Sequence, residues 1–339
     1  MSLRTGLLGY GIAGRVFHAP LIAATPGLEL SAVVTSDATR RAHAEATYPG
    51  LALPATVEEL FELDLDLIVV ATPNRTHVPL ALAAIEAGIA VVVDKPFAPT
   101  SADARRVLQA AKDRNVPVTV FQNRRWDGDF RTVRSLLAEG ALGAVTRFES
   151  RFERWTPEVW DNWREFGAPD EAGGLLYDLG AHLVDQALEL FGPVSTVYAE
   201  LDLRRPGVEV DDDVFVALTH VNGVRSHLWA SSAAPEHGPR FRVLGSTGAY
   251  VSHGLDRQED ALAAGKPFED LSTNGRLGLL DDAEDVVGLP GAYSEFYRLL
   301  VAALTDGGPL PVEPESAVRA LEVIEAAFAS ARTGQVVSL

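Results

Sequence analysis

The sequence predicts an α/β fold: an N-terminal Rossmann domain with a doubly wound parallel sheet, then an α+β domain with a large, mainly antiparallel, open-faced sheet. A glycine-rich turn follows the first apolar run, further short apolar runs alternate with helical patterns, and alternating strand patterns occupy the second half. The chain of 339 residues is also longer than a single domain with one compact core usually is, so two domains are expected. We place the first domain at 1–122 and the second at 123–339, with the last helix a candidate to pack back on the first domain.

Five short apolar runs without alternation are typical of strands buried on both faces of a parallel sheet. They span 3–8, 28–34, 67–71, 89–94 and 116–122. A helix is predicted over 76–87, ended by Gly88. A second is predicted over 100–114, where Thr100 and Asp103 have the spacing of a capping box. These strand and helix signals predict the parallel sheet.

The second half carries the signals of an antiparallel sheet. Polar and apolar residues alternate over 145–155, 195–203 and 214–219, and 240–252 is typical of a hairpin with its turn at 245–248. A long helix is predicted over 314–333. We expect helices to cover one face of this sheet. The uncovered face would need a partner, which favours a homodimer or homotetramer formed through it.

Composition excludes several classes of protein. A net charge of −18 disfavours contact with the phosphate backbone of nucleic acids. The chain has no cysteine, so disulfides, thiolate metal sites and a cysteine nucleophile are excluded. No apolar run approaches the roughly 18 residues of a membrane span, and glycines interrupt the run after Arg4 where a signal peptide would continue. A cytoplasmic protein is the expectation.

The glycine-rich turn "GLLGYGIAG" has the G-x-G-x-x-G spacing of a dinucleotide-binding loop. Its glycines allow a tight turn and close approach to a pyrophosphate, which the N–H groups of the next helix bind. The alternative is a plain glycine turn. Pro20 falls inside the expected first helix, so we predict a kink or an early break there. The residues predicted to face the cofactor here are Gly9, Gly11, Ile12, Ala13 and Gly14.

The end of the second strand bears on the choice between NAD and NADP. An NAD site usually carries an acid here for the ribose 2′-OH, whereas hydroxyls and arginine suit a 2′-phosphate. Thr35, Ser36 and Arg40 therefore favour NADP. If the Asp37 side chain reaches the ribose instead, the preference reverses to NAD.

Lys95 follows the fourth strand, at the sheet edge where ligands bind in such folds. A lysine at an edge is usually a solvated charge, but Asp94 and Pro96 flank this one and stiffen the backbone. The Lys95–Pro96 bond is a candidate for the cis form.

The stretch "LLYDLGAHLVD" at 175–185 predicts an apolar helix with one titratable stripe. Asp178, His182, Asp185 and Glu189 are spaced to share a face. Such a stripe is costly unless it lines a cavity or finds partners. The alternatives are a histidine–acid pair satisfied within the core and a metal site of Asp178, His182 and Asp185.

Four motifs in order resemble the Gfo/Idh/MocA oxidoreductases: "GYGIAG", "ATPNRTH" at 71–77, "DKP" at 94–96 and "GGLLYDLGAHLVDQ" at 173–186. Four further stretches look most like the NADP-dependent scyllo-inositol dehydrogenase branch of that family. They are "VFHAPL" at 16–21, "NRRWDGDF" at 123–130, "DNWRE" at 161–165 and "GLDRQEDAL" at 254–262. The first domain would then bind the dinucleotide, and the second would bind substrate and form the oligomer.

The resemblance implies roles for particular residues. The family's E-K-P lysine falls on Lys95, with Asp94 in place of the usual Glu, and its D-x-x-x-H pair falls on Asp178 and His182. The implied catalytic residues are Lys95, Asp178 and His182. Further cofactor contacts are implied for Thr72, Pro73, Asn74, His77, Asp94, Lys95, Asn123, Trp163 and Arg164. Substrate contacts are implied for Lys95, Asn123, Arg124, Trp163, Asp178 and His182.

The chemistry of these groups suits the oxidation of an alcohol. An imidazole with a reference pKa near 6.5 can take the proton at neutral pH, and a lysine can stabilise the developing alkoxide. Tryptophans interleaved with charged residues over 126–164 suit a polyol or sugar. The implied activity is hydride transfer between NADP, or NAD, and a cyclitol or sugar. The alternatives are a non-catalytic dinucleotide sensor and a glucose–fructose type oxidoreductase.

Overall fold

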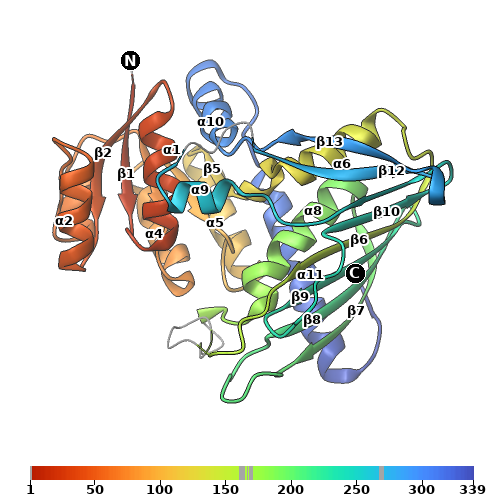
Figure 1. The fold of residues 1–339 in the computed structure, drawn as a ribbon. Coiled ribbons are helices and arrows are strands. Elements are labelled where there is room, and N and C mark those ends of the chain that lie inside the picture. Colours follow the sequence, from red (N-terminus) through yellow and green to blue (C-terminus); the bar gives the residue numbers. More distant parts are fainter. Residues whose placement is uncertain (1, 160–164, 166, 168–170, 267–270) are drawn as a thin grey trace. The chain divides into compact units, whose positions relative to one another are not determined.

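The computed structural model describes residues 2–159, 165, 167, 171–266 and 271–339 (Figure 1). The chain forms two compact units, which we describe separately. The first contains Met1–Asn123, Glu259–Pro267 and Tyr293–Val318. The second contains Arg124–Gln258, Phe268–Ala292 and Arg319–Leu339. Two segments from late in the sequence therefore join the first unit.

A five-stranded parallel sheet in the order β2-β1-β3-β4-β5 is the centre of the first unit. Its strands are β1 (Leu3–Leu8), β2 (Leu28–Val34), β3 (Leu67–Val70), β4 (Ala90–Asp94) and β5 (Val118–Phe121). Every residue of β3 and β5 is buried, as expected for strands covered on both faces. The predicted doubly wound sheet is confirmed.

The helices that lie between these strands are π-helix η1 (Ala13–His18), α1 (Ala19–Ala24), α2 (Ala38–Thr47), α3 (Val57–Phe61), 3-10 helix η2 (Asn74–Thr76), α4 (His77–Glu86) and α5 (Ser101–Arg114). Helix α10 (Ser294–Asp306) joins the unit from late in the sequence. Helices α4 and α5 match the two predicted over 76–87 and 100–114. Thr100 caps α5 by accepting the N–H of Asp103 at 3.1 Å. The break expected near Pro20 is present, since η1 gives way to α1 just before this proline, which lies in the first turn of α1.

The second unit is built on a nine-stranded sheet in the order β13-β12-β11-β10-β6-β9-β8-β7-β14. All neighbours run antiparallel except β6 and β9. The strands are β6 (Val145–Glu153), β7 (Val194–Asp202), β8 (Asp213–His220), β9 (Arg225–Ser231), β10 (Phe241–Gly245), β11 (Ala249–Ser252), β12 (Ser272–Gly278), β13 (Glu284–Pro290) and β14 (Val337–Ser338). The predicted hairpin is confirmed, with the Gly245 N–H donating to the Gly248 carbonyl at 2.9 Å across its turn.

One face of this sheet packs against helices. Helix α8 (Ala181–Phe191) contacts β6 and β9, and α6 (Gly128–Ala138) contacts β12 and β13. The core between them is aromatic, with Phe148, Phe152 and Phe241 fully buried. Among the described residues, the other helical elements are η3 (Asn123–Trp126), π-helix η5 (Leu176–Gly180), η6 (Leu280–Asp282), α11 (Pro314–Thr333) and α9 (Gln258–Ala263), most of which belongs to the first unit.

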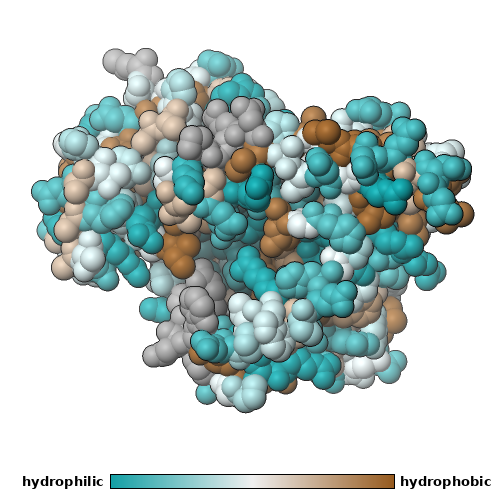
Figure 2. Space-filling model, viewed as in Figure 1, coloured by the Kyte–Doolittle hydropathy of each residue, from teal (hydrophilic) through white to brown (hydrophobic). Residues whose placement is uncertain are grey.

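The opposite face of the sheet keeps its side chains partly exposed. Phe215, His227 and Trp229 form an aromatic cluster there, with ring centroids 5.2–6.1 Å apart. Hydrophilic residues cover most of the surface in Figure 2, with hydrophobic residues in small groups. No described helix is long and apolar enough to cross a bilayer.

Candidate active site

The glycine loop has two positions, Gly9 and Gly14, at which only glycine fits. A Cβ at Gly9, which has φ +95°, would lie 2.3 Å from the Ala71 carbonyl oxygen, and one at Gly14 would lie 2.1 Å from that of Gly9. Gly9 therefore permits the turn and Gly14 permits the helix to pack close. Gly11 differs, because the nearest atom to its added Cβ is Arg40 Nη1 at 3.8 Å. Its bare backbone leaves open space, which fits the close approach of a pyrophosphate.

Ile12 and Ala13 form the entrance to helix η1. Ile12 is its N-cap residue, and its apolar side chain is 60% exposed. The N–H groups of a first helical turn are available to bind an anion. The loop therefore fits the phosphates of a dinucleotide.

The acid after β2 is occupied within its own helix. The Asp37 carboxylate caps α2 by accepting the N–H of Arg40 at 2.9 Å, and it also lies 3.8 Å from the Arg40 guanidinium. Thr35 and Ser36 lie between β2 and this cap. The Arg40 guanidinium in turn approaches Gly11. The end of β2 is therefore followed by a cation and by a carboxylate already used as a helix cap.

The loop after β3 is stabilised by a hydrogen bond between two of its own side chains. The hydroxyl of Thr76 donates to that of Thr72 at 2.6 Å, and Asn74 in the same loop is buried. Pro73 is the N-cap residue of η2. His77 lies beneath the loop, with Nε2 2.9 Å from the Thr72 carbonyl oxygen and Nδ1 2.8 Å from that of Pro96.

His77 thus joins the loops that follow β3 and β4. Burial lowers the pKa of its imidazole, so at neutral pH the ring has one N–H and donates to one carbonyl at a time. The side chain is 1% exposed, so the ring supports both loops from within the protein.

Lys95 directly follows β4, and its peptide bond to Pro96 is cis. The Lys95 N–H donates to Asp94 Oδ1 at 2.8 Å, while Asp94 Oδ2 lies 3.7 Å from Nε2 of His18. Burial acts to raise the pKa of Asp94, but His18 and the Lys95 charge outweigh it, and the pKa is lowered. Asp94 is therefore ionised beside the lysine at neutral pH.

Asn123 and Arg124 are buried in η3. The Arg124 guanidinium lies 4.9 Å above the ring of Phe152, and its carbonyl accepts from Gln186 Nε2 at 2.9 Å. Trp163 and Arg164, assigned to cofactor and substrate from the sequence, lie outside the described residues.

The predicted catalytic helix has two parts. Asp178 lies in the π-helix η5, half-buried, and His182 is the second residue of α8, only 4% exposed. The ring of His182 meets that of Phe152 edge-on, with centroids 6.5 Å apart. Asp178 and His182 belong to the second unit and Lys95 to the first.

The four titratable residues predicted to share one face of this helix form two pairs. Asp178 and His182 are the first pair, and Asp185 and Glu189 are the second. Asp185 and Glu189 both bind Arg125: its Nε and Nη2 donate to the two Asp185 oxygens at 2.8 and 2.7 Å, and its Nη1 lies 2.9 Å from Glu189. The two acids therefore fix α8 to η3. Asp185 is unsuited to the metal set considered from the sequence, and the described residues hold no group of three His, Asp or Glu side chains able to bind a metal ion.

Sequence reasoning missed Asp211, which holds the start of this helix. Asp211 Oδ2 accepts the N–H of Leu176 at 2.7 Å, and its carbonyl accepts that of Leu175 at 2.8 Å. A Cβ at Gly174 would lie 2.2 Å from Asp211 Oδ1, so this contact needs glycine. Burial raises the pKa of Asp211 to about 6. The run of three aspartates at 211–213 was the available signal.

A buried arginine, Arg240, was also missed. Its guanidinium binds Asp129 at 3.1 Å, Ser150 at 2.6 Å and Gln186 at 3.0 Å, and lies 4.0 Å above the ring of Phe152. It links α6, β6 and α8 around the ring that meets His182. No local pattern marks it in the sequence.

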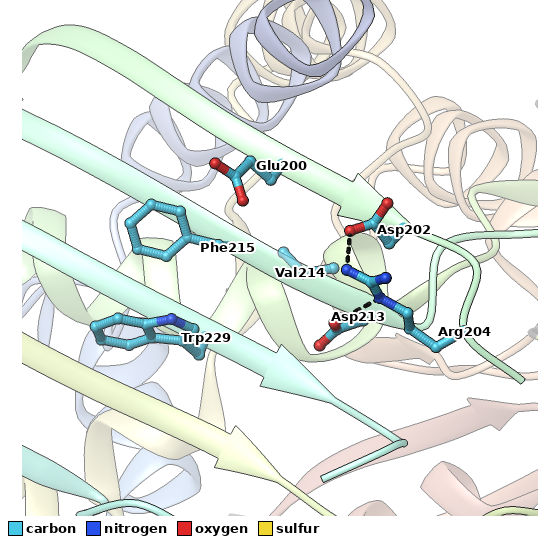
Figure 3. A pocket seen from close by; sticks show the side chains of 7 residues that line it. All are labelled: Glu200, Asp202, Arg204, Asp213, Val214, Phe215 and Trp229. Carbon is cyan, nitrogen blue, oxygen red and sulfur yellow. Dashed lines mark hydrogen bonds and ion pairs between the residues drawn. The ribbon is translucent and has the colours of Figure 1, made fainter. Parts of the chain in front are cut away.

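A shallow pocket of about 320 Å³ lies at the other face of the large sheet (Figure 3). It is lined by Glu200, Asp202, Arg204, Asp213, Val214, Phe215 and Trp229. Arg204 donates to Asp202 at 2.5 Å and to Asp213 at 3.2 Å across it. None of the predicted catalytic residues lines this pocket.

Comparison with known families identifies the class of protein. The model described as "Oxidoreductase family, NAD-binding Rossmann fold" matches residues 3–122, and the "GFO/IDH/MocA C-terminal domain" matches residues 130–251. The chain therefore belongs to the Gfo/Idh/MocA oxidoreductases, and it is an enzyme with an NAD-binding Rossmann domain.

Relatives of known sequence and structure support this membership. YdgJ, an oxidoreductase of Escherichia coli strain K12, is 42% identical over 98% of this chain and 97% of its own length. The scyllo-inositol 2-dehydrogenase (NADP(+)) IolW of Bacillus subtilis strain 168 is 32% identical over 100% of this chain and 96% of its own. The structure of the oxidoreductase yvaA from Bacillus subtilis has a TM-score of 0.93 at 32% identity and covers 100% of this chain and 99% of that one.

Proposed function

We propose that this enzyme is an NADP-dependent dehydrogenase that interconverts a secondary alcohol and a ketone on a cyclitol or sugar. The observation that carries the choice of NADP is the arrangement after β2, where Asp37 is used as a helix cap and Arg40 approaches Gly11. A guanidinium suits a 2′-phosphate, and a carboxylate engaged by a helix N-terminus is a poor partner for a ribose hydroxyl.

In the proposed reaction Lys95, His182 and Asp178 each have a separate role. His182 takes the proton from the substrate hydroxyl, and the Lys95 ammonium stabilises the alkoxide as it forms. Asp178 orients the imidazole or a second hydroxyl. When bound, the nicotinamide accepts the hydride in oxidation and supplies it in reduction.

The substrate class is supported by similarity and by the residues near His182. IolW, named as acting on scyllo-inositol with NADP, is 32% identical over the full chain. Arg124 and the half-buried Asp178 offer the donors and acceptors that hydroxyl groups need. We assign Asn123, Arg124, Trp163 and Arg164 to substrate and nicotinamide contacts within this proposal.

Purified protein incubated with NADP and a panel of inositols and aldoses tests the activity, with NADPH formation read by its absorbance. We expect reduction of NADP with at least one cyclitol or sugar, and much less with NAD. A panel without any turnover in either direction, with the ketone products also offered, would contradict the substrate class.

An Arg40→Ala variant tests the cofactor preference. Losing a charge-assisted hydrogen bond costs about 1.5–3 kcal/mol, so NADPH should bind roughly 10- to 100-fold more weakly. NADH should bind almost as before, because it lacks the 2′-phosphate. Fluorescence titration of both nucleotides measures this, with Arg106→Ala, an exposed arginine paired to Asp103 on α5, as the control. Equal losses for the two nucleotides would remove Arg40 from the 2′-phosphate site.

A further inference from the structure

A buried row of polar side chains within the first unit leads to Asp94, the residue before Lys95. The hydroxyl of Tyr297, on α10, lies 2.6 Å from Nδ1 of His18, at the end of η1. Nε2 of the same ring lies 3.7 Å from Asp94 Oδ2. Neither His18 nor Tyr297 is exposed to solvent. Tyr297 on α10 thus contacts His18 on η1, and His18 in turn faces Asp94 at the end of β4.

The groups that face the His18 ring determine which of its nitrogens has the proton. Burial raises the pKa of Tyr297 well above its ordinary value, so the phenol keeps its proton and can donate. If it donates to Nδ1, the proton of a neutral His18 ring is on Nε2, which faces the Asp94 carboxylate. The opposite tautomer would set a lone pair against that carboxylate, which is unfavourable. The geometry therefore selects the Nε2–H form.

Asp94 transmits this contact to the main chain. Its Oδ1 accepts the Lys95 N–H at 2.8 Å, while Oδ2 faces His18. The carboxylate is thus bound on one side by the backbone of the proposed catalytic lysine. On the other side it faces a helix that begins at the glycine loop. The charges of Lys95 and His77 also act to lower the pKa of Asp94, and Asp94 in turn helps to raise that of Tyr297.

We propose that His18, oriented by Tyr297, is a positioning residue that holds Asp94, and through it the main chain of Lys95, in a fixed place relative to the glycine loop. The positioning of Asp94 is inferred only from the contacts of Tyr297, His18 and Lys95. Its consequence for turnover rests on the proposed function. The aromatic surroundings of His18 favour one fixed orientation, since its ring centroid lies 4.4 Å from that of Phe121.

Two variants at position 18 distinguish the effect of the His18 N–H donor from the effect of the side chain's volume. In His18→Gln the side-chain amide can still present an N–H toward Asp94, whereas His18→Met fills the space without a donor. We expect His18→Met to lower kcat by about 10- to 100-fold, the scale of a misplaced reacting group. His18→Gln should recover most of that loss, and NADPH binding should change little in either.

The pH profile distinguishes positioning from a general loss of stability. His18 helps to lower the pKa of Asp94. Without its donor that pKa rises, so the carboxylate is protonated at a higher pH. The acid limb of kcat/KM should therefore move to higher pH in His18→Met and stay in place in His18→Gln. The matched control is Thr119→Val, which removes a buried hydroxyl bonded to the Val312 carbonyl at 2.7 Å in the same unit and should leave the profile unchanged.

A measurement independent of turnover tests the tautomer. Long-range ¹⁵N–¹H correlation spectra of the protein with labelled histidine should show His18 protonated at Nε2, with the peak assigned by its loss in His18→Gln. A proton found on Nδ1 alone would overturn the proposal, as would an acid limb that is the same in His18→Met and the wild type. The spectrum remains decisive even if no cyclitol or sugar is turned over, so the two failures are distinguishable.

Discussion

His182 is both a buried residue and the predicted general base. The ring is buried beside Phe152 at the start of α8, one turn from Asp178. A histidine this buried could serve packing alone, and the chemistry of the family is what favours a base. Substitution therefore has to separate the two roles.

We expect His182→Ala to lower kcat by about 10²- to 10⁴-fold, because the substrate proton loses its acceptor. NADPH affinity, measured by fluorescence titration, should remain within a few-fold of the wild type. His253→Ala, at an exposed position after β11, is the control and should keep full turnover. Near-normal turnover in a folded His182→Ala variant would exclude this imidazole as the base.

At the scale of the element, α8 is held to η3 by one arginine. Arg125 binds both oxygens of buried Asp185 and also binds Glu189, whose side chain is 31% exposed. Acids that share a helical stripe with His182 thus have a structural role. The helix carrying His182 depends on this pair for its place in the second unit.

Removing Arg125 should be strongly destabilising, because it leaves the Asp185 carboxylate buried without its partner. We expect Arg125→Met to lower the free energy of unfolding by about 3–5 kcal/mol. Glu189→Gln should cost less than about 1 kcal/mol, since that carboxylate is partly solvated. Urea denaturation followed by circular dichroism measures both. Equal losses in the two variants would contradict the assignment of the main contact to Asp185.

Asp211 gives the start of the same helix a dependence on pH. Its pKa is raised to about 6 from an ordinary value of 3.8, so the folded state favours the protonated acid. This contribution to stability is fully present below the ordinary value and is lost as pH rises through about 6. A shift of this size corresponds to on the order of 3 kcal/mol.

An Asp211→Asn variant should lack this loss, because its amide oxygen can still accept the Leu176 N–H without a charge. We expect the stability of the wild type relative to the variant to fall between pH 4.5 and pH 7.5. Denaturation at a series of pH values measures it, with Asp282→Asn, an exposed acid of η6, as the control. A difference that does not change with pH would show that Asp211 does not titrate in this range.

At the scale of the whole molecule, the outer face of the nine-stranded sheet is the proposed oligomer interface. The half-buried Phe215 and Trp229 lie there, with Arg151 3.9 Å above the Trp229 ring. The acids Glu200 and Asp202 on β7 lie toward one edge, and Arg151 and Arg242 on β6 and β10 lie beyond β9. Glu149 binds both of these arginines, at 3.0 and 2.8 Å, so a second copy related by a two-fold axis would mainly cover the aromatic side chains.

We expect the protein to be a homodimer or homotetramer in solution and Trp229→Glu to shift it toward monomer, because a carboxylate would be desolvated at the interface. Light scattering coupled to size-exclusion chromatography measures the mass. Val221→Glu, at a residue 70% exposed after β8, is the control and should leave the mass unchanged. A wild-type monomer at micromolar concentration would remove this face from consideration as the interface.

Features encoded over a few neighbouring residues were predictable from the sequence. The parallel strands appear as uninterrupted apolar runs, and Thr100 is followed by the α5 it caps. The strands β12 and β13 were not predicted, since glycines and exposed polar residues dilute their alternation. A strand with few buried side chains has too weak an alternation of polar and apolar residues to be recognised in the sequence.

The sequence by itself determined the class of fold, the glycine loop and the residue types available for hydride-transfer chemistry, because these depend on short-range sterics and hydrophobic periodicity. Only the tertiary structure decided which charged groups have partners. Asp185 binds an arginine 60 positions away, and His18 meets a tyrosine 279 positions away. Burial and electrostatic pairing depend on distance in space, and no spacing along the chain encodes contacts of that range.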